Sequence, residues 1–82
     1  MQIIFYTADW CPQCKVMYPI IESITEKHDV PLKIVNVGGE NEDEYRHILS
    51  LPTIEIIKEN GDIKMLAGIV STNKIETEMG LS

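Results

Sequence analysis

The sequence predicts a single α/β domain with the element order β-α-β-α-β-β-α, in which helices flank a four-stranded mixed sheet. Short apolar runs alternate with segments of helical spacing, and a hairpin signal separates the last two apolar runs. The 82 residues leave room for one domain only, residues 1–82. In this order a right-handed crossover joins the first two strands in parallel, and the hairpin adds an antiparallel pair.

The first half of the chain predicts a strand, a helix and a second strand. Gln2–Thr7 is a nearly unbroken apolar run, which is typical of a buried strand. Helical spacing then extends over residues 11–28, where one apolar stripe is formed by Met17, Ile20, Ile21 and Ile24. Pro19 lies inside this helix and removes one hydrogen bond, so we expect a kink rather than two helices. The β-branched residues of 32–37 predict the second strand.

A short helix and a hairpin are expected next. The run Asn41-Glu42-Asp43-Glu44 favours the start of a helix, because carboxylates there face the positive end of the helix dipole. Residues 53–58 and Ile63–Ala67 predict two strands, and Asn60-Gly61 between them is a strong hairpin signal.

The chain is expected to finish with a last helix. Ser71 or Thr72 is suited to cap its start, and Ile75 and Met79 would face the core. Gly80 is suited to end it, since glycine adopts the left-handed conformation found after many helices.

Composition excludes several classes of function. A formal charge of −6 provides no basic face for nucleic acid or for an anionic membrane surface. No run approaches the 18 or so apolar residues of a membrane span, and the N-terminus lacks the basic region of a signal peptide. Two cysteines are too few for a disulfide framework. We therefore expect a cytoplasmic protein without nucleic-acid or membrane partners.

Cys11 and Cys14, at the junction of the first strand and the first helix, give the strongest functional signal. One helical turn brings their sulfurs within disulfide reach, because a bridge needs Cα atoms about 4.4–6.8 Å apart. The helix start adds unpaired N–H groups and the positive end of the dipole, which favour a thiolate. Cys14 lies on the apolar stripe, whereas Cys11 precedes the first turn, so we expect Cys11 to meet a partner and Cys14 to be sheltered. The alternative interpretation is two buried cysteines that act as small hydrophobes.

Several separated motifs resemble thioredoxins. The family's active-site segment resembles Trp10-Cys11-x-x-Cys14-Lys15-x-x-x-Pro19, and its cis-proline loop resembles Leu51-Pro52-Thr53. The hairpin followed by Ala67-Gly68 resembles the family's ending. The resemblance spans nearly the whole chain and implies a minimal thioredoxin fold without the family's first strand and helix. Glutaredoxins use the same minimal core.

The resemblance also shows departures. Thioredoxins carry a buried aspartate six residues before the first cysteine, where it assists proton transfer at the second, and this chain has Phe5 there. Deprotonation of Cys14 must then rely on water or another group. Glutaredoxins usually have lysine at the position of Ala8 and threonine at that of Ser50, so a dedicated glutathione pocket is not expected.

The resemblance implies a reductase of protein disulfides. Cys11 would attack a client disulfide and Cys14 would resolve the mixed disulfide, with no cofactor beyond this redox-active pair. The residues expected to contact the client are Trp10, Pro12, Leu51, Pro52 and Gly68. The expected partners are disulfide-containing client proteins and a thioredoxin reductase as electron donor, and the expected state is a monomer.

Four alternatives remain at this point. The chain could be a glutathione-coupled, glutaredoxin-like enzyme, a disulfide oxidant or isomerase, or a non-catalytic partner subunit that uses the same surface. It could also be a metal-binding C-x-x-C protein. Structural zinc needs four protein ligands, and His28, about 25 Å from the cysteines at 1.5 Å per helical residue, cannot join them. Only a metal site that bridges two subunits would remain.

Overall fold

The computed structural model describes residues 1–37, 48 and 50–80. Its elements are, in order, β1 (Gln2–Thr7), α1 (Pro12–Lys27), β2 (Leu32–Asn36), β3 (Thr53–Ile57), β4 (Ile63–Ala67) and α2 (Thr72–Glu78). The helix expected after residue 41 lies outside the described residues. The other predicted elements are confirmed, with bounds that differ by at most a residue or two.

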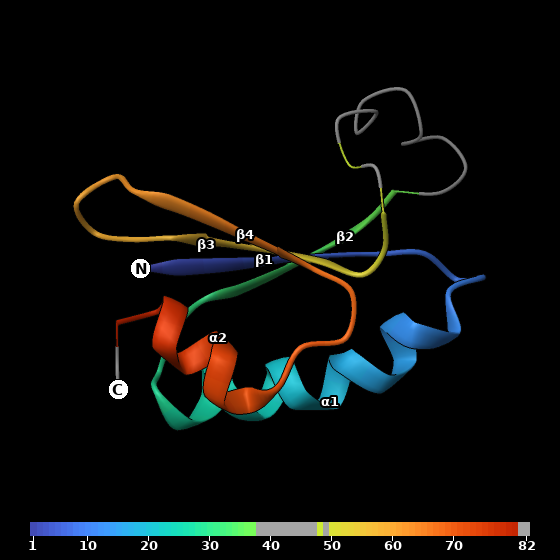
Figure 1. Cartoon of the computed structure of the whole chain (residues 1–82), viewed down its shortest axis with the longest axis horizontal. Helices are drawn as coiled ribbons and strands as arrows, with labels where there is room; N and C mark the ends of the chain where they lie inside the picture. Colours follow the sequence, from blue (N-terminus) through green and yellow to red (C-terminus); the bar gives the residue numbers. More distant parts are fainter. Residues whose placement is uncertain (38–47, 49, 81–82) are drawn as a thin grey trace.

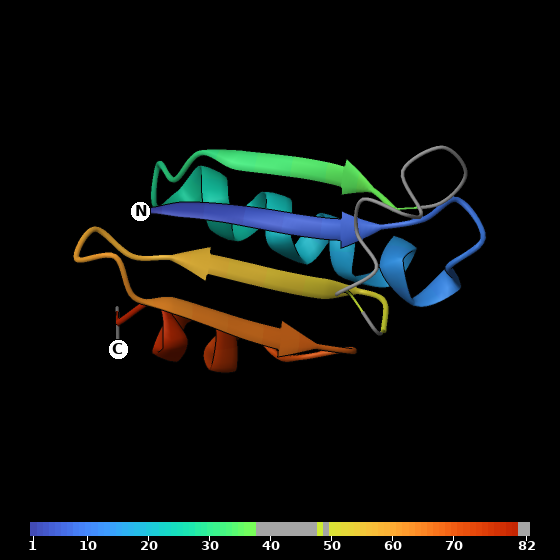
Figure 2. The same ribbon diagram turned by 90° about the horizontal axis from the view of Figure 1, so that it is seen from above.

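The four strands form one mixed sheet in the order β2-β1-β3-β4 (Figure 2). The central strand β1 pairs in parallel with β2 and antiparallel with β3, and β3 pairs antiparallel with β4. Both described helices lie on the same side of this sheet (Figure 1). The predicted crossover and the predicted hairpin are therefore both present.

The core lies between α1, α2 and the sheet face that they cover. The stripe predicted for α1 is buried at Met17, Ile21 and Ile24, together with Cys14, while Ile20 is half-buried at its flank. The sheet contributes alternate residues, because successive side chains of a strand point to opposite faces: Ile3, Phe5, Ile54 and Ile56. Ile75 and Met79 complete the core from the C-terminal end, as expected.

The first helix is continuous over 16 residues and includes Pro19. It begins directly after Cys11, which is its N-cap, and Pro12 occupies the first helical position, where a missing N–H costs nothing. The helix therefore starts at the reactive pair because of the local sequence.

The expected turns are also confirmed. Gly61 adopts a φ of +93° in the β3–β4 hairpin, which Lys58 N–H closes by donating to Asp62 O at 2.8 Å. Ser71 caps α2 by accepting a hydrogen bond from Lys74 N–H at 3.1 Å, and Gly80 follows that helix with a φ of +83°.

The strand register brings three chain segments to one end of the sheet. Tyr6, near the end of β1, pairs with Thr53 at the start of β3, and Thr53 pairs with Ala67 at the end of β4. The cysteine turn, the proline loop and the glycine after β4 therefore share this end. Of the helices in the described part of the chain, none is long and apolar enough to cross a membrane.

Candidate active site

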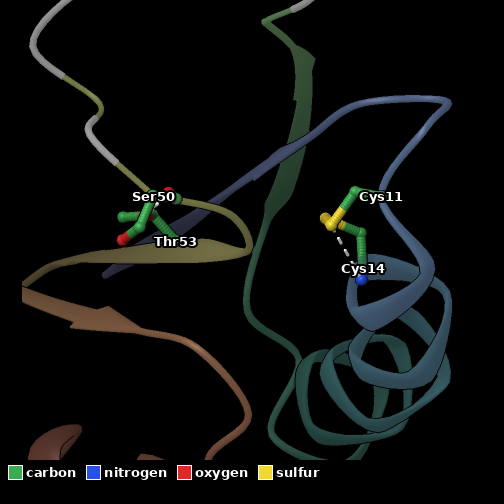
Figure 3. Close-up of a disulfide and its surroundings, with 4 residues drawn as sticks. All are labelled: Cys11, Cys14, Ser50 and Thr53. Carbon is green, nitrogen blue, oxygen red and sulfur yellow. Dashed lines mark hydrogen bonds between the residues drawn. A yellow bond between two sulfur atoms is a disulfide. The ribbon is translucent and has the colours of Figure 1, made fainter.

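Cys11 and Cys14 are joined by a disulfide across the first turn of α1 (Figure 3). Their Cα atoms lie 5.3 Å apart, within the range that the spacing predicted. Cys11 N–H donates to Ala8 O at 3.1 Å, which forms the turn between β1 and α1. Cys14 N–H donates to Cys11 Sγ at 3.2 Å, so the N-capping group of this helix is a sulfur atom. The first turn of α1 thus directs a backbone N–H group at the first cysteine.

Both cysteines are buried in this oxidised form, with 3% of Cys11 and 2% of Cys14 exposed. The helical spacing predicted a sheltered Cys14 and a more accessible Cys11, and this difference is not visible in the exposed fractions. Spacing along one helix does not report neighbours from other segments, and here Ala8 belongs to the same buried cluster, with Leu51 packed against it. The two cysteines differ in position instead, since Cys11 precedes the helix and Cys14 lies inside it.

The proline loop faces the same end of the molecule (Figure 3). The Leu51–Pro52 peptide bond is cis, as the resemblance implied. Thr53 Oγ1 donates to Ser50 O at 2.6 Å and closes the loop, while Pro52 is buried and Leu51 half-buried. The hydroxyl of Thr53, buried at the strand start, therefore stabilises the turn that carries the proline.

Gly68 connects the proline loop to the segment after β4. Its N–H group donates to Pro52 O at 2.8 Å, and its φ is +81°, a conformation that glycine adopts without strain. A Cβ atom at this position would meet no atom within 4 Å, so the space beside Gly68 is open. An approaching chain would find room at this residue.

Exposed apolar side chains lie in the cysteine turn and in the segment that follows β4. Trp10 has 72% of its surface exposed, and Pro12 is exposed next to it. Ile69, directly after Gly68, is also exposed and was not singled out from the sequence. Its apolar side chain, in the loop that follows the last strand, is the sequence feature that could have indicated it. The predicted client-contacting residues thus lie in segments that the fold brings to the end of the sheet where the disulfide lies.

Charged side chains near the turn are at the surface. Asp9 Oδ1 accepts a hydrogen bond from Asn36 Nδ2 at 3.2 Å, and both residues are exposed, as is Lys15. Among the buried residues that the structure describes, none is aspartate, glutamate, lysine, arginine or histidine. Phe5, at the position of the family's aspartate, is 1% exposed. In residues 1–37, 48 and 50–80, no group of three or more histidine, cysteine or acidic side chains is placed to hold a metal ion.

Comparisons with known proteins agree with this geometry. The thioredoxin family model matches residues 1–80. Thioredoxin from Borreliella burgdorferi is 30% identical over 90% of this chain and 66% of its own length, and thioredoxin from Porphyra purpurea is 25% identical over 94% and 75%. The chain thus spans about two thirds to three quarters of these relatives. Thioredoxin 1 from Thermosipho africanus has a similar structure, with a TM-score of 0.76, 26% identity and coverage of 99% of this chain and 97% of that one.

The family match, the cis-proline loop and the cysteine pair at a helix start all support the same conclusion. A pair of cysteines that closes a disulfide at a helix N-terminus exchanges thiol and disulfide reversibly. The chain belongs to the thioredoxin family and is a thiol–disulfide oxidoreductase that reduces protein disulfides.

Proposed function

We propose that Cys11 is the attacking cysteine and Cys14 the resolving cysteine of this reductase. The observation that supports these roles is the hydrogen bond from Cys14 N–H to Cys11 Sγ at the start of α1. In the reduced protein the same N–H group and the helix dipole would stabilise a thiolate on Cys11. Cys14 lies within the first turn, and its own sulfur is not the atom that accepts this hydrogen bond.

The reaction then follows from the two positions. Cys11 thiolate attacks one sulfur of a client disulfide, so that a Cys11–client bond forms and the second client sulfur leaves with the electron pair. Cys14 thiolate next attacks Cys11 Sγ, and the Cys11–client bond breaks. The client gains two electrons and the Cys11–Cys14 pair becomes the disulfide.

We infer that the client binds over Trp10, Pro12, Leu51, Pro52 and Gly68. Trp10 and Pro12 supply exposed apolar surface on one side of the disulfide. The backbone of Leu51, next to the cis-proline, would pair with an extended client segment, which gives affinity without a strict sequence requirement. The open space at Gly68 lets that segment come close.

We propose that the client class is proteins with accessible disulfides and that the electron donor is a thioredoxin reductase. A monomer in the cytoplasm fits this role, because a reducing compartment keeps the dithiol available. A second, glutathione-coupled function would instead require a pocket for glutathione near the cysteines. Ala8 is buried at the position where glutaredoxins usually have lysine, which favours the reductase as donor.

The reduction potential of the Cys11–Cys14 pair tests this proposal. The protein would be equilibrated in dithiothreitol buffers and its thiols trapped and counted. A value near or below about −270 mV supports a thioredoxin-type reductant. A value of about −200 mV or above contradicts it and favours a glutathione-coupled or oxidising role. A protein with both cysteines replaced by serine separates redox function from a role as a non-catalytic partner subunit, because only the second would survive.

A further inference from the structure

Trp10 lies in a tight turn that joins β1 to α1. Cys11 N–H donates to Ala8 O at 3.1 Å, so Asp9 and Trp10 are the two central residues of this β-turn. Ala8 and Cys11, at the two ends of the turn, are buried, whereas Asp9 and Trp10 are exposed. Packing therefore does little to hold the Trp10 ring, and its position depends on the conformation of the turn.

A side-chain hydrogen bond joins this turn to the edge of the sheet. Asn36 Nδ2 donates to Asp9 Oδ1 at 3.2 Å. Asn36 is the last residue of β2 and pairs with Thr7, the last residue of β1, while Val37 N–H donates to Thr7 O at 2.9 Å. The end of β2 and the turn after β1 lie at the same end of the molecule (Figure 2). The residue that holds Asp9 is thus itself fixed by backbone pairing.

The two side chains are chemically complementary. The amide of Asn36 has N–H donors, and the carboxylate of Asp9 only accepts, so the bond between them is assisted by charge. Both residues are exposed, and a polar contact in water contributes little to the stability of a whole domain. Its effect is expected to be local, on a turn whose central residues have few other contacts.

We propose that Asn36 and Asp9 are positioning residues, whose hydrogen bond holds the turn so that the Trp10 ring is in place before a client binds. This inference rests on the proposed contact between Trp10 and the client. A loop that is already ordered loses less conformational freedom on binding, so affinity rises without a new contact. Cys11 is held separately, by burial and as the N-cap of α1, and its reactivity should not depend on Asn36.

Four variants isolate this hydrogen bond. Asn36→Ala removes the amide, and Asn36→Asp sets two carboxylates against each other, which repel. The double variant Asp9→Asn/Asn36→Asp, here called the exchange variant, keeps the net charge and restores an amide–carboxylate pair with the partners exchanged. Asn60→Asp is the matched control, because Asn60 Nδ2 donates to Asp62 Oδ2 at the same distance of 3.2 Å in the β3–β4 hairpin. It adds the same charge as Asn36→Asp, at the opposite end of the sheet.

The fluorescence of Trp10 measures the order of the turn directly. Trp10 is the only tryptophan of the chain, so time-resolved fluorescence anisotropy of the reduced protein reports the motion of this ring alone. Asn36→Ala and Asn36→Asp should gain a larger fast component of the anisotropy decay, on the nanosecond scale of loop motion. Asn60→Asp and the exchange variant should match the original protein. An unchanged decay in both Asn36 variants overturns the inference.

Reduction of a protein disulfide measures the consequence for the client. We expect a several-fold higher KM for Asn36→Ala and Asn36→Asp, an unchanged kcat, and the original KM for Asn60→Asp and the exchange variant. The rate with a small aromatic disulfide should be the same in all these proteins, which shows that each is folded and that Cys11 is intact. A KM that stays high in the exchange variant means that Asn36 acts through another contact, and this contradicts the inference.

Trp10→Ala separates failure of this inference from failure of the proposed client surface. If Trp10→Ala raises the KM and the Asn36 variants do not, the client surface stands and only the positioning role fails. If Trp10→Ala keeps the original KM, Trp10 does not contact the client. The inference then fails together with that surface, even where the anisotropy changes as expected.

Discussion

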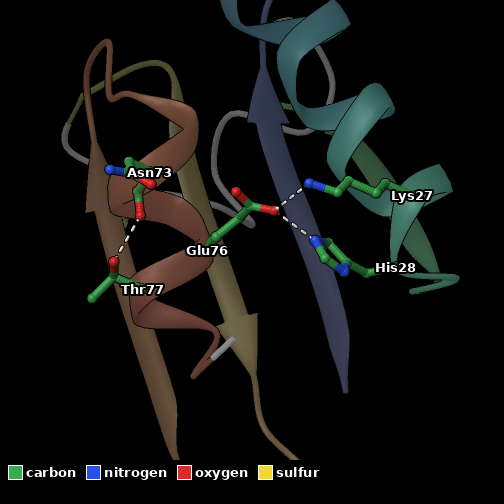
Figure 4. A network of polar contacts seen from close by, with 5 residues as sticks. All are labelled: Lys27, His28, Asn73, Glu76 and Thr77. Atoms are coloured by element: carbon green, nitrogen blue, oxygen red, sulfur yellow. Dashed lines mark hydrogen bonds and ion pairs between the residues drawn. The ribbon is translucent and has the colours of Figure 1, made fainter. Parts of the chain in front are cut away.

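Glu76 Oε2 in α2 lies 2.6 Å from Nε2 of His28, the residue that ends α1 (Figure 4). Lys27 Nζ lies 3.3 Å from the same oxygen, so one carboxylate joins the two helices that cover the sheet. The hydrogen bond with His28 lowers the pKa of Glu76 below its ordinary 4.5, and Lys27 acts in the same direction, against partial burial, which raises it. The contact lies at the end of α1 that is remote from the cysteines.

Replacement of Glu76 by glutamine should lower Tm by a few degrees at pH 7. Because the folded protein binds this proton less readily than the unfolded chain, the stabilisation is fully present above about pH 4.5 and is lost as the pH falls through the lower folded-state value. The Tm difference between the two proteins should therefore close in acid. Calorimetry from pH 3 to 8 measures it. Glu78→Gln, which removes only the exposed pair with Lys74 at 3.2 Å, is the control and should change Tm much less.

Replacement of Cys11 by serine and replacement of Cys14 by serine should block different steps of the reaction. Cys11→Ser removes the attacking sulfur, so we expect no reduction of a protein disulfide above the uncatalysed rate. Cys14→Ser retains the attack but not the resolution, so a covalent complex with the client should accumulate. Non-reducing electrophoresis and mass spectrometry detect that complex. Trapping by Cys11→Ser instead of Cys14→Ser would reverse the assigned roles.

Gly68→Ala should weaken client reduction more than it weakens the fold. An alanine at a φ of +81° costs about 1–2 kcal/mol in backbone strain, and its methyl group would occupy the open space where the client is expected. Gly61→Ala is a matched control, because Gly61 has a φ of +93° and equally open surroundings in the remote hairpin. Both variants should lose similar stability in urea. Only Gly68→Ala should raise the KM for a protein client.

Trp10→Ala should leave the free energy of unfolding almost unchanged, because 72% of this side chain is already exposed. If Trp10 contacts the client, its loss should raise the KM for a protein disulfide several-fold and leave reaction with a small aromatic disulfide almost unaffected. Ile63, exposed at the far end of β4, provides the control variant Ile63→Ala. Equal KM values for the two variants would remove Trp10 from the client surface.

The local sequence was sufficient to predict the elements and the position of the cysteine pair. The strand bounds Gln2–Thr7 and Ile63–Ala67 are those expected, because alternation and turn residues act within a few positions of each other. The equal burial of Cys11 and Cys14 was not predictable in this way, since it depends on segments such as Leu51 that approach from far along the chain.

Side-chain contacts between residues far apart in the sequence could not be predicted either. His28 was recognised only as too remote to bind metal with the cysteines, and its contact with Glu76 spans 48 positions. Phe5 was noted as a departure from the family, but its contact with Tyr18 requires the packing of α1 on β1. Helical spacing places Tyr18 at the flank of the buried stripe without indicating which ring it meets.

The position of β1 between β2 and β3 has a consequence for local opening of the fold. Amide protons of Ile3 and Phe5 lie in a strand that is paired on both sides, so they should exchange with deuterium only when the whole domain unfolds. Amides of the edge strand β4 should exchange through smaller fluctuations. The most protected strand thus runs directly into the reactive turn. Local opening of an edge strand should therefore leave β1, the strand that leads into Cys11, paired.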